Sequence, residues 1–397
     1  MLAPSPSLLP SPTRAIALLA VAGFASQAMV RAADSLLPQI AANFAVSIGT
    51  ASIIISGYAM MHGSMQFIVG PVGERFGKYR VIAVTCALSS LIVLACGLAQ
   101  SLTTLALARI ASGATAAWII PLGMAYIGDV VPYNRRQQVL GRYLSGQVAG
   151  QLFGQAAGGI IGDLFGWRAM FFVLSATFAL AASALFRELA VNPLTLPLTK
   201  PDERSRGFAA DYSLVLARPW ARIVLLAVAA EAAVMWGAFA YVGADLHLRF
   251  HFNFALVGIV VGSFGLGGLI YAFAVKQLVS RCGETGLALH GGFILGFAYL
   301  MLAFTSTWWI TPIAVILLGF GFYMLHNTLQ TNATQMAPRA RGTAVALFSA
   351  VIYLSQTIGV AVLAPVMDRA GAPPIFLGAA ILLPTLGLWL AGRLRNR

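Results

Sequence analysis

Two carboxylic acids lie inside long apolar segments of this sequence, Asp34 and Glu231. An acid surrounded by hydrocarbon is costly unless it is protonated or paired, so each is a candidate for function. Low-dielectric surroundings disfavour the charged form of such a group, which can therefore take up and release a proton. Asp34 stands one helical turn from Arg31, and a local ion pair between them is the structural alternative. Glu231 has no charged neighbour in the sequence.

Other polar and aromatic residues in apolar segments could complete a binding site. Arg109 is costly to bury and should face the protein interior and find a partner; the alternative is a side chain that extends outward to the membrane surface. A single His in such a segment, as at His62, is more typical of a hydrogen-bonded packing residue. The remaining candidates for contact with a small molecule are Gln66, Trp118, Trp236, Tyr323, His326, Asn327 and Gln330.

The composition indicates what surrounds these residues. Of 397 residues, 59% are hydrophobic and 9% are charged, and the mean hydropathy is +0.84. A soluble domain carries about 25% charged residues, so a soluble enzyme, a disordered protein and a nucleic-acid binder are excluded. The sequence has no Gly-rich loop ending in Lys-Ser or Lys-Thr and no His-Glu-x-x-His pair. We therefore expect a polytopic protein of the lipid bilayer that is not an enzyme and uses no cofactor or metal.

Twelve apolar segments are long enough to be spanning helices, because a hydrocarbon core of about 30 Å takes about 20 helical residues. The segments are continuously apolar rather than alternating, which favours helices over strands. The expected fold is all-α, with twelve transmembrane helices. They are residues 15–43, 50–70, 80–100, 103–128, 141–162, 169–186, 222–244, 255–275, 286–304, 309–334, 343–366 and 374–392.

Lys and Arg indicate the orientation, because cytoplasmic loops are enriched in them. With the N-terminus inside, both termini are cytoplasmic and only Arg168, Arg249 and Arg369 lie outside, which accounts for the net charge of +13. Cleavage near Val30-Arg31-Ala32, which resembles a signal-peptidase site, is the alternative and would leave eleven spans. The cytoplasmic set comprises 20 of the 25 basic residues: Arg14, Arg75, Lys78, Arg80, Arg135, Arg136, Arg142, Arg187, Lys200, Arg204, Arg206, Arg218, Arg222, Lys276, Arg281, Arg339, Arg341, Arg393, Arg395 and Arg397.

The longest polar loop divides the spans six and six. Three landmarks recur on its two sides, at separations of 206, 206 and 205 residues: Arg75 and Arg281, Pro132 and Pro338, Asp163 and Asp368. Six spans return the chain to the same side of the membrane, so we expect a duplicated unit with parallel copies. The expected domains are an N-terminal six-helix bundle (1–186), a cytoplasmic linker (187–221) and a C-terminal six-helix bundle (222–397).

The most specific motif joins the second and third spans. It contains a glycine, three residues, an acid, Arg, one residue, Gly, a basic residue, one residue and a basic residue. Its glycines permit a tight turn and close helix approach, and composition alone would indicate an ordinary basic turn. In this order the motif resembles the signature of the major facilitator superfamily, with Glu in place of the more usual Asp. The residues are Gly70, Gly73, Glu74, Arg75, Gly77, Lys78 and Arg80.

Two further motifs agree with this resemblance. Arg109, followed four residues later by Gly113, is similar to the family's helix-4 motif, with Ser112 in place of the usual Gln. Glycines four apart in the fifth span predict close helix packing and also resemble the helix-5 motif of the family's proton-driven exporters. That motif has Pro where this chain has Gln155. The glycines are Gly146, Gly150, Gly154, Gly158 and Gly159.

The resemblance covers the whole chain and implies a secondary transporter that works by alternating access. Helices 1, 4, 7 and 10 would line a central cavity, and Gly70 to Arg80 would form a cytoplasmic latch with Asp129 as a candidate partner. We expect proton-coupled export of a small organic molecule by a monomer in a bacterial inner membrane. Protonation would occur at Asp34 and Glu231, with Arg109 as counter-charge. Proton-coupled uptake is the alternative within this class; a channel or a membrane-integral enzyme would be another class.

Overall fold

The computed structural model describes residues 12–196 and 208–396. Within these residues the regular structure is entirely helical and no strand occurs, as the continuously apolar segments predict. The linker residues Lys200, Arg204 and Arg206, and the C-terminal Arg397, lie outside the described residues.

The residues before the linker form eight α-helices and one short 3-10 helix. They are α1 (Pro12–Asn43), α2 (Ile48–Ala51), α3 (Ile53–Phe76), α4 (Lys78–Gly97), α5 (Leu102–Ala116), α6 (Ile119–Val130), α7 (Tyr133–Phe165), α8 (Trp167–Val191) and η2 (Pro193–Thr195). We call residues 12–196 the N-terminal part.

The residues after the linker also form eight α-helices and one 3-10 helix. They are α9 (Phe208–Leu216), α10 (Pro219–Phe239), α11 (Val242–Phe250), α12 (Phe254–Gly262), α13 (Phe264–Phe304), α14 (Ile310–Gln335), η3 (Pro338–Ala340), α15 (Arg341–Ala370) and α16 (Pro373–Arg395). We call residues 208–396 the C-terminal part.

Ten helical segments of the described chain are long and apolar enough to cross a membrane, and the expected number of twelve stays a prediction. Two places in the chain account for the difference. Residues 141–162 lie inside α7, whose Arg, Gln and Gly residues lower its hydropathy. The expected spans 255–275 and 286–304 fall in one segment, Phe254–Phe304, although the backbone leaves the helical conformation at Gly283 with a φ of 61°.

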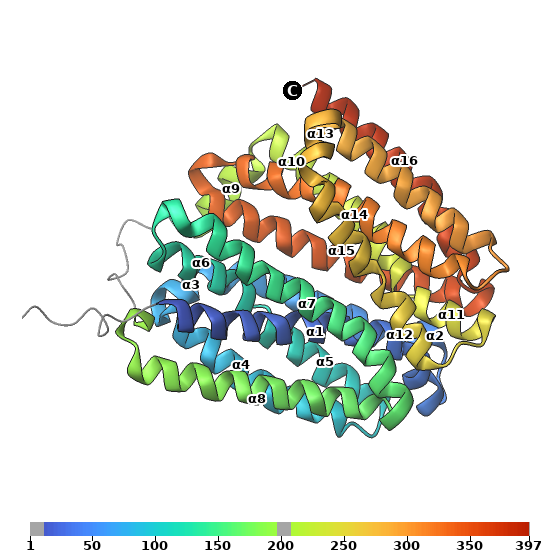
Figure 1. Ribbon diagram of the computed structural model, residues 1–397, viewed down its shortest axis with the longest axis horizontal. Helices are drawn as coiled ribbons and strands as arrows, with labels where there is room; N and C mark the ends of the chain where they lie inside the picture. Colours follow the sequence, from blue (N-terminus) through green and yellow to red (C-terminus); the bar gives the residue numbers. More distant parts are fainter. Residues whose placement is uncertain (1–11, 197–207, 397) are drawn as a thin grey trace, which may run out of the picture.

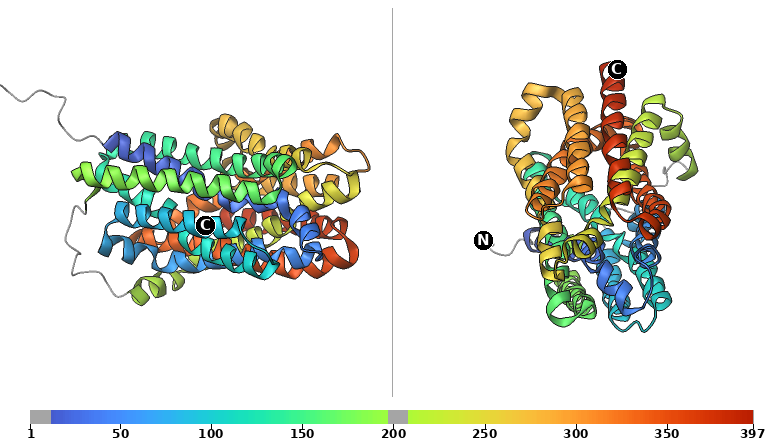
Figure 2. Two further views of the ribbon diagram at one scale, coloured as in Figure 1. Left: turned by 90° about the horizontal axis from the view of Figure 1, so that it is seen from below. Right: turned by 90° about the vertical axis from the view of Figure 1, so that its right-hand side faces the viewer.

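The N-terminal and C-terminal parts lie side by side as two groups of helices, and the figures show them meeting around α2, α11 and α12 (Figures 1 and 2). From there α13 and α16 diverge from the α1–α8 group toward the C-terminus, whereas α15 stays packed along α3 (Figure 1). We call the end of the molecule near α2 the α2 end. The opposite end, which carries η2 and α9, is the linker end.

The outer surface of the helices is apolar. Phe273 is 87% exposed, Leu180 is 73% exposed and Leu91 is 66% exposed. Large exposed apolar side chains in this number are unfavourable in water and typical of a surface that contacts lipid. This surface agrees with a protein that spans the bilayer.

A seam of glycines brings α7 against α1. A Cβ atom at Gly146, Gly150, Gly154 or Gly158 would press on the α1 backbone at Ala20, Phe24, Ala28 or Ala32 in turn. Small residues four apart allow this approach of two backbones. Gly159 instead faces α12, at Phe254 and Gly258. The seam therefore determines how closely the polar residues of α1 approach those of α7.

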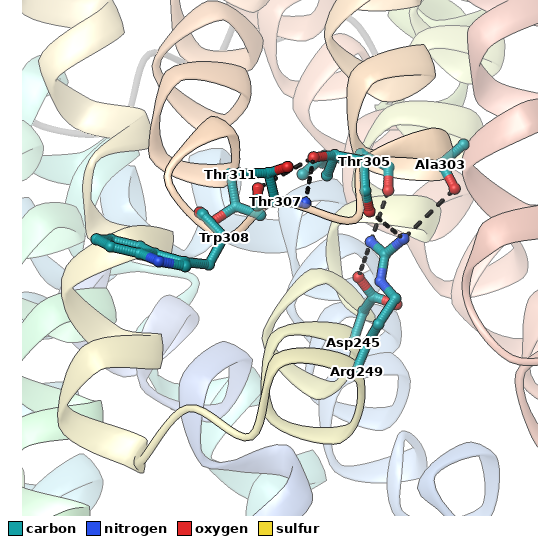
Figure 3. Close-up of polar contacts among 8 residues, drawn as sticks. Asp245, Arg249, Ala303, Thr305, Thr307, Trp308 and Thr311 are labelled. Atoms are coloured by element: carbon teal, nitrogen blue, oxygen red, sulfur yellow. Dashed lines mark hydrogen bonds and ion pairs between the residues drawn. The ribbon is translucent and has the colours of Figure 1, made fainter.

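At the α2 end, Arg249 of α11 holds the end of α13 (Figure 3). The last carbonyls of a helix have no partner within the helix. Arg249 donates to the carbonyls of Leu302, Ala303 and Thr305 at 2.6, 3.4 and 3.2 Å, and its Nη2 is 2.5 Å from the Asp245 carboxylate. In the nearby turn the Thr305 hydroxyl bonds to the backbone carbonyl and amide of Thr307, and the Thr311 hydroxyl donates to the Trp308 carbonyl (Figure 3). This cluster fixes α11 to the α13–α14 connection.

Candidate functional site

Glu231 of α10 and His326 of α14 form a hydrogen-bonded pair. His326 Nδ1 is hydrogen-bonded to Glu231 Oε2 at 2.7 Å. The Glu231 side chain is 1% exposed and that of His326 is 14% exposed. Glu231 Oε1 has no hydrogen-bond partner among the described residues. The two sequence candidates with the clearest proton chemistry in the C-terminal part are thus joined in one buried site.

Aromatic rings continue from this pair toward the N-terminal part. The His326 ring stacks on Phe322 with centroids 4.7 Å apart. Phe322 meets Trp236 edge-on at 5.0 Å, and Trp236 also contacts Phe239 and Phe264. Edge-on and tilted ring pairs of this kind are favourable packing arrangements. Trp236, a predicted stacking residue, is therefore connected to the acid–base pair through Phe322.

Arg31 of α1 covers the face of Trp236. Its guanidinium carbon lies 3.5 Å from the ring centroid, which is a cation–π contact across the two parts of the chain. Arg31 Nη1 is 3.7 Å from Asp34 Oδ2, an ion pair that is too long for a hydrogen bond. Arg31 is 7% exposed and Asp34 is 2% exposed. The structural alternative for Asp34, a local ion pair with Arg31, is thus present.

Arg109 faces the interior, as its cost of burial predicts, but its partners are carbonyl groups. It is fully buried and donates to the carbonyls of Ile54 and Met29 at 3.0 Å each. Its guanidinium lies over the Tyr58 ring at 4.4 Å. Within the described residues no carboxylate contacts it, although Asp34 is near enough to interact electrostatically. Arg109 therefore ties α5 to α1 and α3.

Gln155 of α7 lies beside Asp34. It is fully buried, and both atoms of its amide lack a hydrogen-bond partner among the described residues. A buried amide without partners is unfavourable. The residue that departs from the exporter motif thus adds an unsatisfied polar group next to Asp34.

His62 lies at the contact between α3 and α15. Its ring is 4.2 Å from that of Tyr353 and 5.6 Å from that of Tyr58, and its Nδ1 has no hydrogen-bond partner in the described chain. Gln66, one turn further, donates to the Ala117 carbonyl at 3.3 Å. Both residues occupy the interior, between helices.

The remaining predicted cavity residues are placed differently. Tyr323 packs on Phe322 at 5.3 Å and stacks on Tyr271 at 6.4 Å. Asn327 is close to the Tyr271 hydroxyl, and Gln330 is exposed. Trp118 donates to the Ala114 carbonyl and borders an apolar groove with Phe76 and Arg80. Gln330 and Trp118 therefore do not join the cluster around Glu231, His326, Trp236 and Arg31.

Sequence reasoning missed several aromatic members of this site. Tyr58 lies one helical turn before His62, and Phe322 lies one helical turn before His326. Each ring contacts the histidine that follows it. Helical spacing was the signal that could have found them. Tyr353 carries no such signal, because its contact with His62 joins helices far apart in the sequence.

The motif that runs from Gly70 to Arg80 contains an ion cluster at the linker end. Lys78 Nζ is 2.6 Å from Asp129 Oδ2 and 2.7 Å from Glu74 Oε1. Gly77 forms the turn with a φ of 89°, a conformation that glycine adopts without strain. Arg75 is exposed and contacts the Phe76 ring at 5.3 Å. Lys78 is therefore the residue of this motif that contacts Asp129.

Of the other motif residues, Gly73 faces Leu122 of α6, whereas a Cβ at Gly70 would meet no atom. Close packing by glycine is therefore required at Gly73.

At the α2 end, two aspartates connect the parts of the chain. Asp368 accepts from the Gly49 backbone amide and from the Ser47 hydroxyl at 2.7 Å each. Asp163 accepts from the Phe254 backbone amide at 3.1 Å. Each carboxylate thus lies at the N-terminus of a helical segment of the other part, where exposed amides and the helix dipole favour an anion.

Comparison with known proteins identifies the class to which this arrangement belongs. A model of the Major Facilitator Superfamily matches residues 19–360, and the chain belongs to this family. It is 25% identical over 327 residues to the uncharacterized MFS-type transporter YceJ of Bacillus subtilis (strain 168), with 82% of each chain covered. It is 24% identical over 359 residues to a probable sugar efflux transporter of Helicobacter pylori (strain HPAG1), with 90% of this chain and 89% of that one covered.

A solved structure shows the same fold. It is a bacterial homolog to the human lysosomal transporter Spinster in an inward-facing and unoccupied conformation, with a TM-score of 0.74 and 19% identity. The similarity covers 98% of this chain and 99% of that chain. This protein is therefore a multi-pass membrane transporter of the superfamily and not an enzyme.

Proposed function

We propose that this protein is a proton-coupled secondary transporter that exports a small organic molecule by alternating access. The observation that carries the proposal is the buried Glu231–His326 pair. A carboxylate in mid-membrane with one unsatisfied oxygen is costly when ionised, so its protonation changes the relative stability of conformations that differ in water access. Such a difference is what coupling of a proton to a conformational change requires.

The proposed architecture has twelve spans in two six-helix bundles, residues 1–186 and 222–397, joined by the linker 187–221. Two features of the helices support a count of twelve spans. The helix α7 has 33 residues, which at 1.5 Å per residue is about 50 Å and exceeds the thickness of a hydrocarbon core. The break at Gly283 divides Phe254–Phe304 into two segments that are each long enough to cross.

The proposed orientation places the linker end and both termini in the cytoplasm of a bacterial cell. The bias of Lys and Arg supports this orientation. The contacts made by Asp163 and Asp368 then close the outer side, and the state is inward-facing. A single cysteine placed near Arg204, in a variant without Cys282, should react with a membrane-impermeant reagent only from the cytoplasmic side. Reaction in intact cells would contradict this orientation.

Export is the favoured direction because relatives include proteins named as probable sugar efflux transporters and because α7 carries the exporter-like glycines. A sugar is accordingly one candidate substrate class. Uptake together with a proton is the second candidate. The Arg31–Asp34 ion pair favours it, since protonation of Asp34 would free Arg31 for an anionic substrate.

We propose Asp34 as the second proton-binding residue and Arg31 as its direct partner, with Arg109 acting on Asp34 from a distance. We also propose that the chain acts as a monomer.

The test is transport by proteoliposomes that contain the purified protein under an imposed pH gradient, screened over a panel of sugars, organic acids and organic amines. Glu231→Gln resembles the protonated form and cannot release a proton. It should abolish gradient-driven transport while retaining exchange of substrate. The matched control is Glu284→Gln, an acid of the same type that accepts a hydrogen bond from Asn332 near the linker end. Full gradient-driven transport by Glu231→Gln would contradict the proposal.

A further inference from the structure

Arg31 is a buried cation whose hydrogen-bonding capacity is mostly unused. A guanidinium has five N–H donors. Its Nε has no partner among the described residues, and its one ionic contact, with Asp34, is 3.7 Å long. Arg109, by comparison, donates to two carbonyls at 3.0 Å. Burial of a charge with so few hydrogen bonds is unfavourable, which indicates that Arg31 is arranged for a ligand.

The orientation of Arg31 leaves those donors available. Its guanidinium lies with its carbon 3.5 Å from the Trp236 centroid, so one planar face is covered by the ring. The N–H groups of a guanidinium point outward in its plane and match the two oxygens of a carboxylate. Tyr323 and Tyr353 are near enough to interact electrostatically with Arg31, so the surroundings of these donors are aromatic.

We propose that Arg31 binds the carboxylate of the transported molecule, and that the aromatic side chains around it contact a flat apolar group of the same molecule. The substrate class is thus an organic monocarboxylate with an aromatic or similar ring. This inference rests on the proposed function, in that this cluster is taken as the transport site. A dianion such as a phosphate monoester would need a second free cation, and Arg109 has already committed donors to Ile54 and Met29.

Asp34 and the substrate then compete for one guanidinium. With Asp34 ionised, a second carboxylate next to Arg31 would create an excess negative charge in surroundings of low dielectric constant. Removal of the Asp34 charge therefore strengthens binding of the anion, which is the behaviour expected of the second candidate function, uptake together with a proton. The unpartnered amide of Gln155 beside Asp34 can donate to either carboxylate.

The test uses three compounds with the same ring and different charge: benzoate, benzamide and benzylamine. Their binding to the purified full chain in detergent is measured by calorimetry at neutral pH. Benzoate should bind at least about tenfold more tightly than the other two, because a hydrogen bond to a charged group contributes roughly one factor of ten or more. Arg31→Gln should remove this preference, Arg31→Lys should retain part of it, and Asp34→Asn should bind benzoate more tightly than the unaltered chain. Glu284→Gln should bind as the unaltered chain does.

Three results would overturn the proposal: equal binding of benzamide and benzoate, no binding of benzoate to the folded chain, or unchanged benzoate affinity in Arg31→Gln. The ligand series on the unaltered chain and the Asp34→Asn variant keep the test decisive even when Arg31→Gln does not fold. Failure of the proposed function has a different signature, because binding in detergent needs no gradient. Normal gradient-driven transport by Glu231→Gln would reject the coupling role and leave the benzoate result standing.

Discussion

His326 Nδ1 and Glu231 Oε2 are hydrogen-bonded at 2.7 Å although 95 residues separate the two in the sequence. The bond joins α10 to α14, and each of the two side chains forms part of the other's surroundings. The coupling role that we propose for Glu231 therefore involves His326 as well, and substitution of either residue changes the surroundings of the other.

Non-additive effects are expected from a double-mutant cycle on this pair. Glu231→Gln and His326→Gln should each lower thermal stability in detergent, since each leaves a buried group of its partner with an altered hydrogen bond. The double variant should lose less stability than the two single variants together, with an interaction energy of about 0.5–3 kcal/mol. Additive losses would show that the bond does not couple the residues in the folded protein.

Arg109→Gln should lower the thermal stability of the protein. The variant removes the charged donor that joins the carbonyls of Ile54 and Met29, and a hydrogen bond to a charged group contributes about 1.5–3 kcal/mol. The measurement is the midpoint of thermal unfolding, with Arg393→Gln as the control because Arg393 is exposed. Equal midpoints for the two variants would refute a structural role for Arg109.

Lys78→Ala should impair transport more than Arg75→Ala. The motif predicts a role for both residues, but Lys78 is the one that contacts Asp129 and Glu74, whereas Arg75 is exposed. Arg75 is exposed, and the ion-pair partners of Lys78 are 63% and 42% exposed, so each loss should cost about 0–1 kcal/mol and both proteins should fold and insert. Initial transport rates per inserted protein distinguish the two variants. A larger transport defect in Arg75→Ala than in Lys78→Ala would indicate that Arg75, and not Lys78, is the main residue of the latch.

The double variant Asp163→Asn and Asp368→Asn should open the α2 end. Each charge at a helix N-terminus contributes about 0.3–1 kcal/mol, so the loss of both should shift the equilibrium roughly threefold to thirtyfold. Spin labels at Leu164 and Leu248, which are exposed at this end in the two parts of the chain, report the distance by pulsed electron resonance. An unchanged distance distribution would exclude a closing role for the two aspartates.

Much of the fold could be predicted from local pattern. Continuous apolar segments indicated an all-helical membrane protein, and the glycines of α7 indicated close helix packing, although not that α1 is the partner. The Arg31–Asp34 pair was also accessible, because three residues on a helix bring side chains to one face.

The contacts between helices were not accessible in this way. Glu231 and His326, or Arg31 and Trp236, meet because of how helices rotate and pack, and no spacing within one helix records that rotation. Arg109 shows the same limit. The cost of burying Arg109 predicted a partner in the interior. The carbonyls that accept its hydrogen bonds belong to other helices, and the sequence around Arg109 does not indicate which acceptor it would meet.

The aspartates at the α2 end have a consequence for how such a chain could have arisen. Asp163 acts on the C-terminal part and Asp368 acts on the N-terminal part, so neither part makes this closure on its own. A reciprocal exchange of this kind is what a two-fold symmetric pair of identical subunits makes across its interface. Joining the two parts in one chain turns an association that depends on protein concentration into an intramolecular one. Opening and closing are then properties of a single polypeptide, and dilution in the membrane does not weaken them.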